Sequence, residues 1–320
     1  MARYTLGRLL IAVPTVLLLS VLIFGIMRVL PGDVALIMLA GSGEASNSVS
    51  ERDLSTLREK LGLTRSAPEQ YLTWIGNILR LDLGRSTWNG QPIGPDIARG
   101  LQVTLELAVL ALLVSVVVSI PLGVLAAVHQ DTWVDYGVRV LSMTGIAMPS
   151  FWTGTLILLV LSTAVGWLPS LVYVPPWANL QNNLLQMAWP AAVLGYAQAA
   201  VITRMTRSQM LEILRQDYVR TAWAKGLGGR IVLYRHALKN ALLPVVTLLG
   251  LEFAILVGGA VVIEKVFSLP GLGLYLVEAT SARDYPVVQT VILVIGLLVA
   301  LVNLGVDLLY GVLDPRVRYG

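Results

Sequence analysis

The sequence predicts an all-α integral membrane protein with six transmembrane helices, and three observations carry that prediction. Of the 320 residues, 56% are hydrophobic and 13% are charged, and the mean hydropathy is +0.75. Soluble domains carry roughly twice that fraction of charge, so this chain has too few polar groups to cover a water-facing surface. Six apolar segments also approach the roughly 20 residues that a helix needs to cross the hydrocarbon core of a bilayer.

Each of the six segments is expected to be helical, because a lipid-exposed backbone must satisfy its own hydrogen bonds. The segments are Leu9–Met27, Val103–Val128, Val140–Leu161, Met187–Thr203, Ala241–Ile263 and Val287–Tyr310. The first is longer than the apolar region of a cleaved signal peptide and no A-x-A site follows it, so we expect it to be retained as a span. Pro149, inside the third segment, predicts a kink or break, because proline lacks the backbone donor.

The distribution of charge predicts how the chain is oriented. No charged residue occurs from Val140 to Thr203, whereas Arg204–Lys239 holds eight Lys or Arg and two acidic residues. Short basic loops stay in the cytoplasm. We therefore expect the loop between spans four and five and both termini, with Arg3, Arg8, Arg316 and Arg318, on the cytoplasmic side, and Pro31–Gly100 on the other.

The long external segment is expected to fold as a small helical cap. One amphipathic pattern begins after a predicted N-cap at Ser50 and continues with Leu54, Leu57 and Leu61. A second pattern is predicted to place five apolar residues on one helical face: Tyr71, Leu72, Ile75, Ile78 and Leu79.

Several chemistries are excluded by the residues that the chain lacks. It has no cysteine, and its two histidines, His129 and His236, are far apart, so neither a thiolate site nor a histidine metal site is expected. None of the four lysines follows a glycine, so no Walker A loop can hold ATP. No order of Ser, His and Asp typical of a hydrolase is present. The basic isoelectric point is explained by the cytoplasmic loop, so no nucleic-acid partner is expected, and we predict a transport subunit with no metal site rather than an enzyme.

A patterned basic stretch in the loop resembles a known family. "RTAWAKG" (Arg220–Gly226) is similar to the EAA loop of ABC importer permeases, with Arg220, Thr221 and Ala222 at E-A-A and Gly226 at the glycine. His236 and Leu238 stand at the I and L positions, and Lys239 replaces the proline. Four other stretches resemble the same branch: "LPGD" at Leu30–Asp33, "GNILRLDLGRS" at Gly76–Ser86, "EKVFSLPGLGLYLVEATSARDYPVVQ" at Glu264–Gln289 and "VDLLYGVLDPRVRY" at Val306–Tyr319.

Together the five stretches resemble the DppB-type permease subunit of the dipeptide/oligopeptide/nickel ABC importers. The resemblance implies the type I ABC importer permease fold, with a small helical extracytoplasmic insertion after the first span. It divides the chain into an N-terminal tail with the first transmembrane helix (1–30), an extracytoplasmic cap (31–100) and a core permease domain (101–320) that includes a coupling loop (204–240).

The resemblance also implies partners and a location. It implies a second, homologous permease chain, two ATP-binding subunits that hold ATP and Mg²⁺, and an extracytoplasmic substrate-binding protein that delivers peptides or a related small solute. It places the chain as a multi-pass protein in a bacterial or archaeal inner or plasma membrane.

The candidate site residues fall into two groups. The coupling loop is expected to bind an ATPase subunit. Gly226 is expected to end the first short helix without a Cβ clash, and Gly228 and Gly229 can adopt positive φ to turn the chain back. Arg207 is expected to contribute much less. Its candidate residues are Tyr218, Arg220, Thr221, Ala222, Trp223, Gly226, Gly228, Gly229 and His236. The candidate translocation pathway residues are Glu252, Trp152 and Asn303.

Alternative interpretations remain at this point. Glu252, in the middle of span five, either faces the pathway or makes an interhelical hydrogen bond with Asn303 or Gln198. Trp152 either lines the pathway or packs against lipid or helices. The whole chain could instead be an ion-gradient-driven secondary transporter with Glu252 and Asp307 as a proton relay, which internal inverted repeats would favour, or a structural assembly factor. No such repeat is visible in the sequence.

Overall fold

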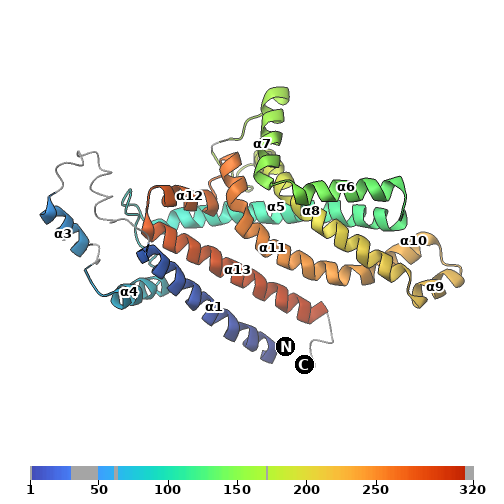
Figure 1. The fold of residues 1–320 in the computed structure, drawn as a ribbon, viewed down its shortest axis with the longest axis horizontal. Coiled ribbons are helices and arrows are strands. Elements are labelled where there is room, and N and C mark those ends of the chain that lie inside the picture. Colours follow the sequence, from blue (N-terminus) through green and yellow to red (C-terminus); the bar gives the residue numbers. More distant parts are fainter. Residues whose placement is uncertain (1, 30–49, 61–63, 171, 314–320) are drawn as a thin grey trace. The chain divides into compact units, whose positions relative to one another are not determined.

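The computed structural model describes residues 2–29, 50–60, 64–170 and 172–313, and every regular element in these ranges is a helix (Figure 1). Leu30–Asp33, Leu61, Arg316 and Arg318 lie outside the described residues, as do the last six residues of the final family-like stretch. The helices are α1 (Ala2–Val29), α3 (Glu51–Lys60), α4 (Ala67–Leu79), α5 (Ile93–Val128), α6 (Trp133–Ala147), α7 (Ser150–Val160), α8 (Leu180–Leu214), α9 (Asp217–Ala224), α10 (Gly229–Ile231), α11 (Lys239–Phe267), α12 (Leu272–Ser281) and α13 (Tyr285–Leu313), with π-helical segments η1 (Leu161–Val165) and η2 (Val232–Leu238).

Five helices of the described chain are long and apolar enough to cross a membrane, and a bent pair supplies a sixth span. The pair consists of α6 and the combined α7 and η1, which meet at 104°. Pro149 precedes α7, and Met148 ends α6 in an extended conformation, so the predicted break at Pro149 is confirmed. Two spans begin earlier than hydropathy predicts: α5 begins at Ile93, and α8 begins at Leu180, where the Asn179 side chain accepts a hydrogen bond from the N–H of Asn182 (3.0 Å). A hydropathy window counts only apolar character, so it does not detect a helix start that is set by a polar N-cap such as Asn179.

The described residues pack as two compact units. The first contains the described residues of 103–269 and 302–313, and in it α8 packs against α6 and α11. The second contains residues 2–102 and 270–301, with a core formed by Ile93, Ile97, Leu272, Ala279, Val287, Val288 and Val291. Residues 270–301 thus pack with the N-terminal part of the chain, a grouping that differs from the expected division in linear order.

Helix α4 packs through part of the predicted apolar face: Tyr71, Ile75 and Ile78 are half-buried. Tyr71 and Trp74 form an aromatic cluster with Phe24 of α1, with ring centroids 5.5 and 6.2 Å from Phe24. The Tyr71 hydroxyl also lies 2.8 Å from the Ser20 hydroxyl. Leu72 and Leu79, which were expected on the packed face, are 65% and 79% exposed. The prediction is therefore wrong for these two leucines, and Trp74, which the pattern did not include, is half-buried in their place.

Candidate functional site

The basic loop predicted to couple the chain to a partner folds as a short helix with its own small core. Helix α9 follows α8 after only two residues and is amphipathic. Val219 (0% exposed) and Ala222 (6%) pack with Val232 of η2 (0%). Half-buried side chains around this cluster are Ile213, Leu214 and Leu227. Burial of these apolar groups holds α9 against the end of α8, so the loop is an ordered protrusion.

A left-handed residue ends α9 at Gly226, where φ is +76°. The N–H of Gly226 donates to the Trp223 carbonyl (2.9 Å), and the N–H of Leu227 donates to the Ala222 carbonyl (3.4 Å). Glycine takes this conformation without a Cβ clash, so the expectation for Gly226 is confirmed. The same expectation is wrong for Gly228, whose φ is −63°, and for Gly229, which begins α10 and has no positive φ. One left-handed residue suffices because α10 restarts the helix directly after an extended Gly228.

The outer face of α9 carries aromatic and basic side chains. Tyr218 is 43% exposed and Trp223 is 53% exposed, and Arg220 and Thr221 are also exposed. The Tyr218 hydroxyl accepts a hydrogen bond from Asn240 Nδ2 (2.9 Å), and this amide also donates to the carbonyl of the half-buried His236 (3.0 Å). Ala222, one of the residues expected in the coupling site, therefore does not lie on this outer face, because its side chain faces the interior of the loop.

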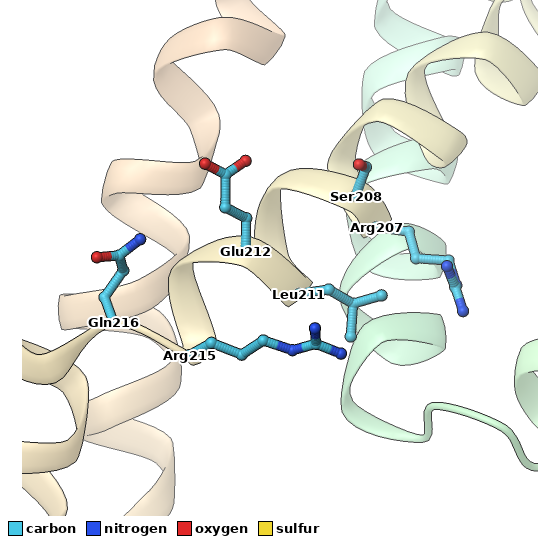
Figure 2. Close-up of a pocket in the computed structure, with 6 residues that line it drawn as sticks. All are labelled: Arg207, Ser208, Leu211, Glu212, Arg215 and Gln216. Carbon is cyan, nitrogen blue, oxygen red and sulfur yellow. The ribbon is translucent and has the colours of Figure 1, made fainter.

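An open recess of about 460 Å³ lies along the last turns of α8, directly before α9 (Figure 2). It is lined by Arg207, Ser208, Leu211, Glu212, Arg215 and Gln216. Figure 2 shows Arg207 and Arg215 extending to one side of α8, while Glu212 and Gln216 extend to the other. The mixture of charges gives the recess no single-sign character that would select an anion or a cation.

Arg207 makes a short, bidentate ion pair with a buried carboxylate. Its Nε and Nη2 each donate to one oxygen of Asp135, both at 2.6 Å, and Asp135 is fully buried on the first turn of α6. Oδ2 of Asp135 also accepts a hydrogen bond from the N–H of Asp131 (3.1 Å). The expectation that Arg207 matters little is therefore not supported by its surroundings. The two partners are 72 positions apart in the sequence, and no local spacing rule connects them.

The candidate pathway residues do not form one cluster. Glu252 is 7% exposed on α11 and makes no hydrogen bond or ion pair with any residue in the described part of the chain. Neither of the expected partners, Asn303 or Gln198, bonds to it. Asn303 is exposed on α13, which approaches α11 so closely that a Cβ at Gly250 would lie 2.3 Å from Val306 Cγ1. Glu252 and Asn303 are therefore each within about one turn of this crossing.

Trp152 lies on α7, a helix that packs against α11, and is 46% exposed. Gly154, two residues further on, packs on Ile263 and Phe267 of α11. Ile263 follows Glu252 by about three helical turns. Trp152 is thus separated from Glu252 along the helix axis.

Two family-like stretches meet at a single carboxylate that the sequence did not single out. Asp284 is 3% exposed and accepts hydrogen bonds from the Ser86 hydroxyl, from the N–H and hydroxyl of Thr87 (3.1 and 2.9 Å) and from the N–H of Trp88 (3.4 Å). We call residues 84–90 together with Asp284 the carboxylate cage. Burial, and to a lesser extent the charges of Asp96 and Asp284, raises the pKa of the Tyr275 phenol to about 12, so this phenol is neutral at physiological pH. The indole of Trp88 is 60% exposed at the tip of the cage.

A second polar network holds the uncharged loop that precedes α8. Gln186 (5% exposed) donates from Nε2 to the carbonyls of Ser170 (3.0 Å) and Val172 (3.2 Å), and its Oε1 accepts from the N–H of Val174 (3.2 Å). Glu106 of α5 accepts hydrogen bonds from the Tyr173 hydroxyl and from Asn183 Nδ2, the second at 2.6 Å. One amide therefore satisfies three backbone groups of a loop that has no regular structure. The only sequence signal for this network is the run of Asn and Gln at the start of α8.

Family models match the whole chain. The model described as binding-protein-dependent transport system inner membrane component matches residues 119–319, and its N-terminal companion matches residues 1–118. Three curated relatives align over the full length of this chain and of their own. They are a putative peptide transport system permease protein of Brucella abortus (43% identical), the oligopeptide transport system permease protein AppB of Bacillus subtilis (38%) and the glutathione transport system permease protein GsiC of Pectobacterium atrosepticum (39%).

The helical fold and these matches define a membrane-embedded transport subunit rather than an enzyme. The chain belongs to the inner membrane permease components of binding-protein-dependent ABC transport systems. A crystal structure of an amino acid ABC transporter with histidines has the same fold over 68% of this chain and 93% of its own, with a TM-score of 0.50 and 13% identity.

Proposed function

We propose that this chain is one of two permease subunits of an ATP-driven importer for peptides. The relatives named for peptide, oligopeptide and glutathione transport, all near 40% identity over the full chain, support a peptide as the substrate. The partners in this proposal are a second, homologous permease, two ATPase subunits and an extracytoplasmic binding protein. ATP and Mg²⁺ bind on the ATPase subunits, because no lysine of this chain stands in a Walker A position.

The proposed orientation places both termini and the loop 204–240 in the cytoplasm of a bacterial or archaeal cell. Its support is the charge asymmetry between the basic stretch Arg204–Lys239 and the uncharged stretch Val140–Thr203. The chain contains no cysteine, so one introduced at the exposed Gly228 can be labelled without background. A membrane-impermeant reagent is expected to reach it only from the cytoplasmic side.

One observation carries the coupling role of the loop: α9 has a buried inner face and an exposed aromatic, basic outer face. Val219 and Ala222 fasten the helix to its own chain, so Tyr218 and Trp223 remain available to a partner. Exposed aromatic side chains on a rigid support are typical of protein contacts. Because α9 continues α8 and leads through η2 to α11, a partner that moves α9 moves two membrane helices directly.

Two neighbouring glycines provide a matched test of this role. Gly226→Val places a β-branched residue at φ +76°, a conformation that costs roughly 1–2 kcal/mol for an L-residue. Gly228→Val places the same side chain at φ −63°, with no atom within 4 Å of the new Cβ. In proteoliposomes that contain the complete complex and ATP, Gly226→Val is expected to lose peptide uptake and binding-protein-stimulated ATP hydrolysis, and Gly228→Val to retain both.

The outcomes separate coupling from topology. If Gly226→Val imports peptide at the rate of Gly228→Val, the loop is only a topology signal. If the unmodified complex hydrolyses ATP without importing any peptide in the presence of its binding protein, the proposed substrate class is wrong.

A second test uses the exposed tryptophan of the loop. Trp223→Ala is expected to reduce peptide uptake. The control is Trp133→Ala, which is expected to leave uptake unchanged, because Trp133 is 90% exposed but lies outside the loop.

A further inference from the structure

The first unit contains a buried ion pair that joins α6, which leads to the break at Met148–Pro149, to α8, which leads to α9. Asp135 stands on the first turn of α6 with none of its surface exposed, and Arg207, whose side chain is 20% exposed, reaches it from α8. Both guanidinium contacts measure 2.6 Å and together engage both carboxylate oxygens. A bidentate pair of this kind fixes the relative position and rotation of the two helices, because two parallel bonds tolerate little sliding.

The same two helices are also joined at the other end of α6. A Cβ at Gly145 would lie 2.8 Å from the Ala200 Cβ, so the helices approach as closely as glycine allows. The Tyr196 hydroxyl of α8 lies 2.8 Å from the Thr144 hydroxyl and donates to the Leu141 carbonyl (2.9 Å). Helix α6 is therefore fastened to α8 near both of its ends, with the ion pair as the charged fastening.

Helix α8 leads to the coupling helix α9, whereas α6 leads to the break before α7. After Arg207, α8 runs two more turns to Leu214, and α9 begins at Asp217. After Gly145, α6 ends at Ala147, and the chain turns by 104° into α7 at Met148–Pro149. Beyond the break, α7 packs on α11 through Gly154. Along the chain, α9 and the break are separated by α7, η1, an irregular loop and all of α8, so the contacts of α8 with α6 provide a short physical route between them (Figure 1).

We infer that Asp135 and Arg207 are positioning residues for transport: their ion pair makes α6 follow α8, and so carries displacement of α9 to the break at Met148–Pro149. The inference rests on the proposed coupling role of α9. A buried ion pair contributes little net stability compared with apolar packing, because both charges are desolvated. Register between two helices is the property that such a pair supplies best.

The deciding variant removes both charges together. Asp135→Asn alone leaves a desolvated guanidinium without its counter-ion and is expected to impair folding, so the test is the double variant Asp135→Asn/Arg207→Gln. The matched control is Asp96→Asn/Arg99→Gln, which removes one acid and one base from an exposed pair (3.5 Å) on α5. Each is assembled with the partner permease, the ATPases and the binding protein in proteoliposomes, and peptide imported per ATP hydrolysed is measured.

We expect the double variant to copurify with its partners and hydrolyse ATP, while peptide imported per ATP falls by about 3- to 30-fold, the range in which single contacts alter coupling. Arg207→Lys, which keeps the charge but not the bidentate geometry, is expected to fall between the double variant and the unmodified chain. The control is expected to match the unmodified chain. Import per ATP equal to the control would overturn the inference while leaving the proposed function intact, and so would failure of the double variant to assemble, since that result shows a purely structural role. Absence of binding-protein-dependent import by the unmodified complex would instead remove the proposed function, and this inference with it.

Discussion

Asp135 and Asp284 are both buried carboxylates, and they differ in what stabilises their charge. Asp135 is held by a guanidinium, a full counter-charge, and by one backbone N–H. Asp284 is held by hydroxyl and backbone N–H donors of residues 86–88, and no cation among the described residues pairs with it. The first arrangement joins two long helices, whereas the second gives a short turn its shape.

The difference decides how each site can be changed without leaving an unsatisfied group. At Asp135, removal of both partners abolishes both charges, so the interior is left without an unpaired ion. At Asp284, the hydroxyls of Ser86 and Thr87 can be removed by substitution, but the backbone N–H groups of Thr87 and Trp88 cannot. The cage therefore has no compensating second substitution, and the ion pair does.

The largest effect is expected for loss of Asp135 alone. Asp135→Ala leaves Arg207 desolvated without a counter-ion, and breaking a buried pair in this way costs about 3–5 kcal/mol. Thermal unfolding in detergent is the measurement, and Asp135→Ala/Arg207→Leu is expected to recover most of the lost stability. Equal loss in the single and double variants would show that Asp135 is needed for packing rather than for charge, and would remove its contrast with Asp284.

A smaller, more local effect is expected at the cage. Asp284→Asn replaces one acceptor oxygen by an amide donor that must face donors, and an unsatisfied buried hydrogen-bonding group costs about 1–3 kcal/mol. Hydrogen exchange at the amides of Thr87 and Trp88 is expected to accelerate. The control, Asp96→Asn, removes a carboxylate that accepts from the exposed Arg99 and is expected to leave those amides protected. Unchanged protection in Asp284→Asn would mean that the turn keeps its shape without the carboxylate.

The smallest effect on stability is expected for Glu252, the third carboxylate compared. Unlike Asp135 and Asp284, it has no hydrogen-bonding partner among the described residues. Glu252→Gln removes a charge near the bilayer centre, where an ionised group costs about 2.5–3.5 kcal/mol on insertion scales, so the variant is expected to be at least as stable as the unmodified chain. If Glu252 faces the pathway, uptake of cationic peptides is expected to fall relative to anionic ones. Asn303→Ala provides the comparison at the same level of α13; an unchanged preference in Glu252→Gln would assign Glu252 to packing.

The features that the sequence predicted correctly are local ones. Hydropathy located the spans, because the bilayer requires a continuous run of apolar residues whatever the tertiary structure. Pro149 predicted the break and Gly226 predicted the left-handed end of α9, because each residue restricts or permits backbone conformations by its own chemistry. The five family-like stretches identified the family, and the family models confirm it.

The features that were missed depend on contacts between distant residues. Arg207 carries the same charge as the other basic residues of its loop, and only the packing of α6 on α8 distinguishes it by placing Asp135 2.6 Å away. The sequence grouped Ala222 with the exposed coupling-loop residues, and only its packing with Val219 and Val232 shows that it lies on the buried face of α9. Asp284 and Ser86 each lie within family-like stretches, yet they are 198 positions apart, so the sequence does not show that they are partners.

The sequence by itself determined that this chain is a six-span, mostly apolar membrane protein with one basic loop and one broken helix, because those properties follow from composition, spacing and single-residue geometry. Tertiary structure alone decided which charges are partners and which face of α9 is buried. The physical reason is that apolar patterning and backbone preference depend on residues and their near neighbours in the sequence. The energy of a buried charge depends instead on the group that the folded chain brings within hydrogen-bonding distance.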